Sequence, residues 1–216
     1  FANWKRSTDG VNYVSQNYDE ERWAIAAAAA KRVIDMGMYK LHTVPSDMFT
    51  PELPANVTSD PDYYKNWEEG GAAGIDHFHS YADMFNGESV IMTNPEYVWA
   101  RHVTSGNLGF DMIFPVTNGG YNIIGVTQKV IDNYSMMDGR SIYESSEEFP
   151  YSETGFTSGV KTFSSYRLNA DVYNMYANRE MRFYVSIGFS ECFWPMSSAT
   201  QAGFYDQTIT YYYDSP

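Results

Sequence analysis

The chain is poor in cysteine, because Cys192 is the single one among 216 residues. A lone cysteine excludes an intramolecular disulfide and a Cys-rich zinc site, so we expect a buried thiol. The chain also lacks a run of 18 apolar residues, the length that a bilayer-spanning helix needs. The sequence therefore predicts no transmembrane helix.

Basic residues are scarce as well. Fourteen Lys and Arg stand against 27 Asp and Glu, which gives a net charge of −13. Binding to nucleic acid or to anionic lipid needs clustered basic side chains, so both partners are excluded. The sequence has no G-x-S-x-G elbow, no phosphate-binding G-x-x-x-x-G-K-[ST] loop and no H-E-x-x-H zinc motif. We expect no cofactor.

One helix is specified at both of its ends, over residues 19–37. Asp19 is a suitable N-cap, acidic residues follow it, Arg32 lies near the other end, and Gly37 can adopt the left-handed conformation that stops a helix. Between them five consecutive alanines leave little side chain on any face, so another backbone can approach closely. This pattern fits an amphipathic core helix or one helix of a tetratricopeptide-like hairpin repeat.

The rest of the chain alternates short predicted elements with long loops. Residues 38–126 form a loop-rich insert with four prolines between 45 and 61 and an edge strand within 88–103. Residues 127–216 begin with a short helix over 127–136 and continue in an irregular segment over 141–165. A hairpin of strands 182–189 and 207–213, joined around Trp194, completes this part. We therefore predict one partial α+β domain over 1–216, loop-rich, with a small antiparallel hairpin.

Aromatic residues are abundant, at 17% of the chain, with 19 Tyr, 13 Phe and five Trp. Rings on loops suit a ligand site, because a flat apolar face can stack on a sugar or line a peptide groove. Packing explains most of these rings. The candidates for ligand binding lie on predicted loops or beside each other on a predicted strand, and they are Tyr63, Tyr64, Trp67, Trp99, Arg101 and Tyr121.

One short segment invites a metal interpretation. His77 and His79 would share a face of a strand, with Asp76 as a third ligand, although nothing else completes such a site. Asp60 and Asp62 lack the glycine and terminal glutamate of a calcium loop. We predict no metal site.

Three segments, in order along the chain, are similar to sequence motifs of one known protein family. The segment ending in AAKRVIDMGMYKL is similar to a helix of the form A-K-x-V-I-D-x-G-x-Y-x-L. Thr127-Gln128, Asp132 and Met137-Asp138-Gly139 resemble an N-P-T-Q-x-L-V-D-x-Y-x-M-x-D-G stretch, and Asn178-Arg179 with Arg182-Phe183 resembles N-R-D-P-R-F-Y. With these three motifs the chain resembles the SusD/RagB family of nutrient-binding outer-membrane lipoproteins. Gly125-Val126 and Glu180-Met181 depart from the motifs, as in a divergent member.

The resemblance implies a mostly α family with tetratricopeptide-like helices, of which this chain would be an internal fragment. It implies a protein on the extracellular face of the outer membrane, held there by an N-terminal lipid that this chain lacks. It also implies non-catalytic capture of an oligosaccharide or peptide for import through a SusC-like TonB-dependent transporter. Two alternatives stay open: a glycan-degrading enzyme or its carbohydrate-binding module, and a structural subunit without its own ligand.

Overall fold

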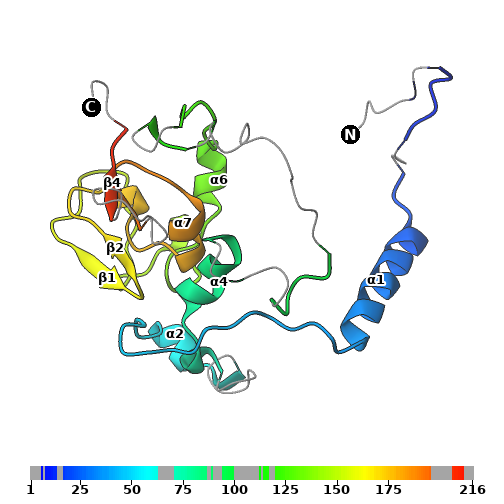
Figure 1. The fold of residues 1–216 in the computed structure, drawn as a ribbon, viewed down its shortest axis with the longest axis horizontal. Helices are drawn as coiled ribbons and strands as arrows, with labels where there is room; N and C mark the ends of the chain where they lie inside the picture. Colours follow the sequence, from blue (N-terminus) through cyan, green and yellow to red (C-terminus); the bar gives the residue numbers. More distant parts are fainter. Residues whose placement is uncertain are drawn as a thin grey trace. The chain divides into compact units, whose positions relative to one another are not determined.

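The computed structural model describes residues 6, 8–13, 17–62, 71–86, 89, 94–99, 112, 114–116, 120–195 and 206–211 (Figure 1). The chain divides into two compact units. The first comprises residues 1–41 and 95–99, and the second comprises residues 42–94 and 100–216. The prediction of a single partial domain stays a prediction.

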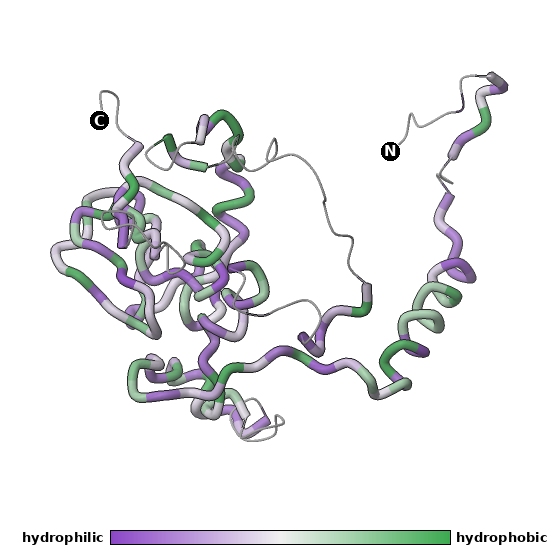
Figure 2. The backbone as a smooth tube through the Cα atoms, viewed as in Figure 1, coloured by the Kyte–Doolittle hydropathy of each residue, from purple (hydrophilic) through white to green (hydrophobic). Residues whose placement is uncertain are grey.

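Helix α1 (Glu20–Asp35) dominates the first unit and has the ends that the sequence predicts. The Asp19 side chain accepts hydrogen bonds from the amides of Glu21 and Arg22, and Gly37 has a φ of 62°. The helix is hydrophilic at its start and hydrophobic along its middle (Figure 2). It buries none of its own residues within the described part of the chain.

The second unit is built from short elements. Its helical segments are α2 (Ala55–Thr58), η1 (Ala72–Gly74), α4 (His77–Asn86), α6 (Gln128–Asp132), η4 (Ile142–Glu144), η5 (Asn174–Tyr176) and α7 (Met181–Ser186). Two antiparallel hairpins accompany them, β1 (Lys161–Phe163) with β2 (Tyr166–Leu168) and β3 (Cys192–Trp194) with β4 (Gln207–Ile209). The prediction of an α+β, loop-rich chain with a small hairpin is confirmed.

The core of this unit lies where α4, α7 and the two hairpins meet. It is rich in aromatic rings, which pack edge-on or stacked, and Phe163 illustrates this with Tyr166 at 5.3 Å and Phe78 at 6.1 Å between ring centres. Cys192 is buried in the same core, as expected. Trp194 packs against the core and meets Phe114 edge-on.

Two secondary-structure predictions are wrong. The segment 182–189 is largely helical, because Met181, Tyr184 and Phe183 bury one face of α7 against the core, and this packing overrides the strand propensity of its residues. The partner of β4 is therefore β3, and Trp194 lies in that strand rather than in the connecting loop. Strand β1 lies at the end of the 141–165 segment that we expected to be irregular, and β2 follows directly after it; the Ser164-Ser165 turn between them is not a common hairpin signal.

Two other expectations are partly met. Helix α6 ends at Asp132, four residues before the predicted end. Residues 94–99 form a turn, and the remainder of the predicted edge strand lies almost wholly outside the described residues. Every helix in the described ranges is too short or too polar to cross a bilayer.

Candidate functional site

Two of the six predicted ligand-binding residues, Trp99 and Tyr121, lie among the described residues. Trp99 is 79% exposed at the end of the 94–99 turn in the first unit, and Tyr121 is 67% exposed in the second unit. The other four, Tyr63, Tyr64, Trp67 and Arg101, lie outside the described residues. Both described rings are therefore exposed enough to stack on a ligand.

Tyr121 begins an extended segment that is held against an earlier part of its own loop. The Asn122 amide donates to the Phe114 carbonyl over 3.1 Å, and the Ile123 amide donates to the Met112 carbonyl over 2.9 Å. The close approach requires a glycine at 120, because a Cβ there would overlap the Phe114 backbone. Tyr121 is therefore presented by a fixed backbone.

The sequence segment around Tyr121 is apolar and uncharged. Ile123, Ile124 and Val126 are each more than half exposed, and no charged residue occurs between 112 and 126. This segment contrasts with the net charge of −13 of the chain. Such a segment can make apolar and stacking contacts with an uncharged ligand, and it has no carboxylate, imidazole, thiol or amine side chain.

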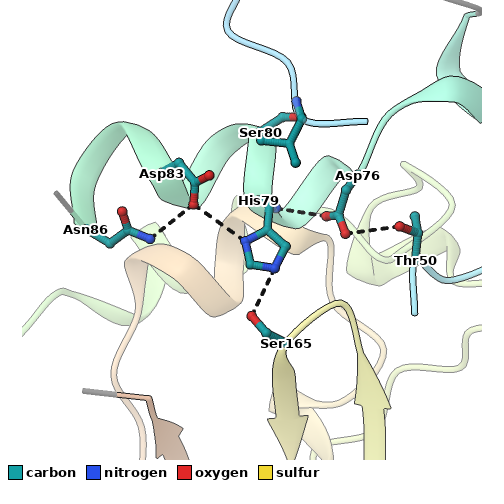
Figure 3. A network of polar contacts seen from close by, with 8 residues as sticks. Thr50, Asp76, His79, Ser80, Asp83, Asn86 and Ser165 are labelled. Atoms are coloured by element: carbon teal, nitrogen blue, oxygen red, sulfur yellow. Dashed lines mark hydrogen bonds and ion pairs between the residues drawn. The ribbon is translucent and has the colours of Figure 1, made fainter. Parts of the chain in front are cut away.

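The metal interpretation of Asp76, His77 and His79 does not fit the structure. These residues begin helix α4 rather than a strand, so the two imidazoles do not share a face. Asp76 Oδ1 accepts from the His79 amide over 2.9 Å, and Oδ2 accepts from the Thr50 hydroxyl over 3.1 Å (Figure 3). The carboxylate therefore starts the helix and fixes residue 50, and the described residues contain no group of three or more potential metal ligands.

Figure 3 also shows a hydroxyl, an imidazole and a carboxylate in line. Ser165 Oγ lies 3.0 Å from His79 Nε2, and His79 Nδ1 lies 3.5 Å from Asp83 Oδ1, which also accepts from Asn86. The order is that of a serine hydrolase, but the imidazole–carboxylate distance exceeds that of a hydrogen bond. What the contacts do provide is a tie between α4 and the β1–β2 turn.

The second and third motif segments lie side by side in the structure. Met136 forms an antiparallel bridge with Arg179, and the Met137 amide donates to the Asn178 carbonyl over 2.8 Å. The Ser135 amide donates to the Glu180 carboxylate over 2.9 Å, and the Glu180 amide donates back to the Ser135 carbonyl over 3.0 Å. Residues more than 40 positions apart are thus joined by backbone pairing.

Arg179 is the most buried large side chain at this junction. It is 0% exposed, and its guanidinium donates to the Ile131 carbonyl at the end of α6. The guanidinium carbon lies 5.3 Å from the centre of the Phe183 ring and 5.7 Å from that of Tyr151. Burial lowers the pKa of Arg179, and burial likewise raises the pKa of Tyr151 to about 12.

Asp138 and Asn178 extend this junction to the neighbouring loops. Asp138 Oδ2 accepts from the Ser146 hydroxyl over 2.7 Å, and the Asp138 carbonyl accepts from the Asn56 side chain over 2.8 Å. The Asn178 side chain donates to the Pro150 carbonyl over 3.0 Å. The motif residues therefore organise α2, α6 and the 141–160 loop, a structural role that the motifs alone did not reveal.

Comparison with known proteins identifies the family of this chain. The family model described as the SusD family matches residues 81–216, which is more than half of the chain and contains both paired motif segments. Searches of the curated proteins and of the solved structures find no match. Members of the SusD family are cell-surface proteins of the outer membrane that bind nutrients, and they are helical. The match over residues 81–216 shows that the chain belongs to the SusD family.

Proposed function

We propose that this protein captures an oligosaccharide or peptide at the outer face of the outer membrane and passes it to a SusC-like TonB-dependent transporter. It does so without catalysis, and a lipid anchor holds it at the surface. Membership of the SusD family is the observation that carries this proposal, because the family's members bind nutrients. Family members are also generally not enzymes.

The proposed contact residues are Tyr63, Tyr64, Trp67, Trp99, Arg101 and Tyr121. Exposure of Trp99 and Tyr121 supports their part in it, since a large aromatic ring that is left in water gains most by stacking on a ligand. The absence of charge around Tyr121 favours an uncharged ligand there. Recognition would combine stacking on these rings with hydrogen bonds from Arg101 and the neighbouring polar groups.

Helix α1 has a different part in the proposal, as a tetratricopeptide-like scaffold helix. Its run of alanines gives a smooth surface, and α1 buries none of its residues within the described part of the chain. Both properties suit close packing of a second helix. In this proposal α1 is a scaffold helix and does not contact the ligand.

Calorimetry against pools of oligosaccharides and peptides tests the ligand assignment. The variants are Trp67→Ala and Trp99→Ala, and Trp23→Ala on α1 serves as the matched control because Trp23 is also exposed. We expect the two loop variants to bind at least about tenfold more weakly and the control to bind normally. Unchanged binding in both loop variants would contradict the contact residues, and release of shortened glycans would contradict a non-catalytic role.

The proposed transporter partner needs its own experiment. We expect the chain to co-purify with a SusC-like transporter from outer membranes, with ligand binding retained in the complex. Co-purification by a chain that binds no oligosaccharide or peptide would instead favour a structural subunit.

A further inference from the structure

A cluster of contacting aromatic rings extends from the core of the second unit to its surface. Phe183, which is 0% exposed, contacts Phe189 and Tyr176 with nearly parallel ring planes, at 5.6 and 6.0 Å between ring centres, and Tyr176 lies 4.9 Å from Phe189. Tyr173 meets Tyr176 edge-on at 6.3 Å. The cluster thus links the buried core to a ring near the surface.

Phe156 forms the outer end of this cluster. Its ring centre lies 5.6 Å from that of Tyr173, and the residue is 59% exposed. Phe156 belongs to the 141–165 segment, in which the sequence indicates no candidate ligand-binding residue. A large ring is therefore held at the surface on a base of packed rings.

The backbone around Phe156 is fixed by antiparallel pairing. Phe156 forms a bridge with Tyr173, the Thr157 amide donates to the Val172 carbonyl over 2.8 Å, and the Asn174 amide donates to the Gly155 carbonyl over 3.0 Å. This pairing holds the ring in place before any ligand arrives, which lowers the entropy cost of binding. It also occupies backbone groups of residues 155 and 157, so a peptide strand cannot pair with them.

Polar residues precede the exposed ring in the sequence and are bonded to Tyr173 and Asn174 beside it. Glu153 and Thr154 are exposed, and the Ser152 and Thr154 hydroxyls lie 3.4 Å apart. The carbonyl groups of 153 and 154 accept from the Tyr173 hydroxyl and, over 2.8 Å, from the Asn174 side chain. A pyranose has an apolar C–H face and a rim of hydroxyls, so a flat ring with hydroxyl and carboxylate neighbours matches it.

The charge around the ring narrows the class of sugar. Glu153 would repel an acidic sugar such as a uronate, as would the net charge of −13. A neutral hexose has no such cost, and its hydroxyls can donate to the carboxylate.

We propose that Phe156, backed by Tyr173, is a stacking subsite for one neutral hexopyranose unit of an oligosaccharide. This inference rests on the proposed capture function and specifies its ligand class. The subsite is distinct from the six residues proposed above, so it can be tested separately from them.

The test is calorimetry of the whole chain with neutral glucan, mannan and galactan oligosaccharides of about six units, beside uronate oligomers and peptides. Phe156→Ala should weaken the binding of a neutral oligosaccharide at least about tenfold, whereas Phe156→Trp should retain it. Tyr143→Ala is the matched control, because Tyr143 in η4 is 83% exposed but is not a ring of the cluster. It should bind like the unchanged chain.

The results that would overturn the subsite can be distinguished from those that would overturn the capture function. Neutral glycan binding that is equal in Phe156→Ala and in the unchanged chain would overturn the subsite and leave the capture function standing. Binding of peptides alone, or tighter binding of uronates, would do the same. A chain that binds no glycan and no peptide would overturn both.

Discussion

Replacing Arg179 by alanine should destabilise the second unit strongly, because this side chain closes the junction between the two motif segments. Its guanidinium is fully buried, donates to the carbonyl of Ile131, and lies over the rings of Tyr151 and Phe183. Alanine removes the hydrogen bond, both ring contacts and the apolar stem of the side chain at once.

The expected magnitude follows from these contacts. A hydrogen bond from a charged group contributes about 1.5–3 kcal/mol, and a desolvated cation–ring contact contributes roughly 2 kcal/mol. Burial of the charge offsets part of this, as the lowered pKa of Arg179 shows, and Nε and Nη1 are buried without a hydrogen-bond partner among the described residues. We therefore expect Arg179→Ala to reduce the free energy of unfolding by about 2–4 kcal/mol.

Urea unfolding followed by tryptophan fluorescence measures this loss. Arg179→Met should lose roughly half as much free energy of unfolding as Arg179→Ala, because methionine refills the space of the arginine stem and removes the buried charge. Arg182→Ala is the matched control: Arg182 is an exposed arginine of the same motif, paired with Glu180 over 2.5 Å, and should change stability by less than about 1 kcal/mol. Equal losses in Arg179→Ala and Arg182→Ala would refute the structural role of Arg179.

Three further predictions concern single groups. Gly120→Ala should lower the free energy of unfolding by about 1–3 kcal/mol, because its Cβ would overlap the Phe114 backbone. Gly125→Ala is the control, because its Cβ meets nothing within 4 Å, and it should leave the free energy of unfolding nearly unchanged in the same urea titration. Equal losses of stability in the two variants would contradict the close approach at Gly120. Cys192 should resist a thiol reagent at pH 8 until urea is added, because burial raises its pKa to about 11, and fast native labelling would show an open core. Burial lowers the pKa of His77, so the unfolded chain takes up a proton at this side chain first as the pH falls through the ordinary value of 6.5. The free energy of unfolding should therefore decrease as the pH falls below that value. Urea midpoints measured from pH 7.5 to 5 test this, and His77→Gln should remove the part of the decrease that His77 causes.

The sequence predicts best those elements whose determinants are local. Helix α1 begins and ends where Asp19 and Gly37 place it, because a cap and a left-handed glycine act on their immediate neighbours. The 182–189 segment is different: its β-branched and aromatic residues favour a strand, but burial of Phe183 and Tyr184 in a shared core makes its first part a helix. That core is assembled from segments that are distant in the sequence, so no local sequence pattern predicts it.

The same contrast holds for the functional residues. Tyr121 could be named as a candidate from its Gly-rich loop, and Trp99 from its place beside Arg101 on a predicted strand; both rings are exposed. The pairing of Phe156 with Tyr173 could not, because it joins residues 17 positions apart through a bridge that has no hairpin turn signal. The burial of Arg179 depends in the same way on packing against α6 and the 141–160 loop.

We propose that this chain binds a nutrient and does not transform it. Isothermal titration of the whole chain with neutral oligosaccharides and with peptides, followed by chromatography of the ligand recovered from the cell, measures both properties. We expect saturable binding and an unchanged ligand. Shortened products, or the absence of binding to every oligosaccharide and peptide offered, would contradict this function.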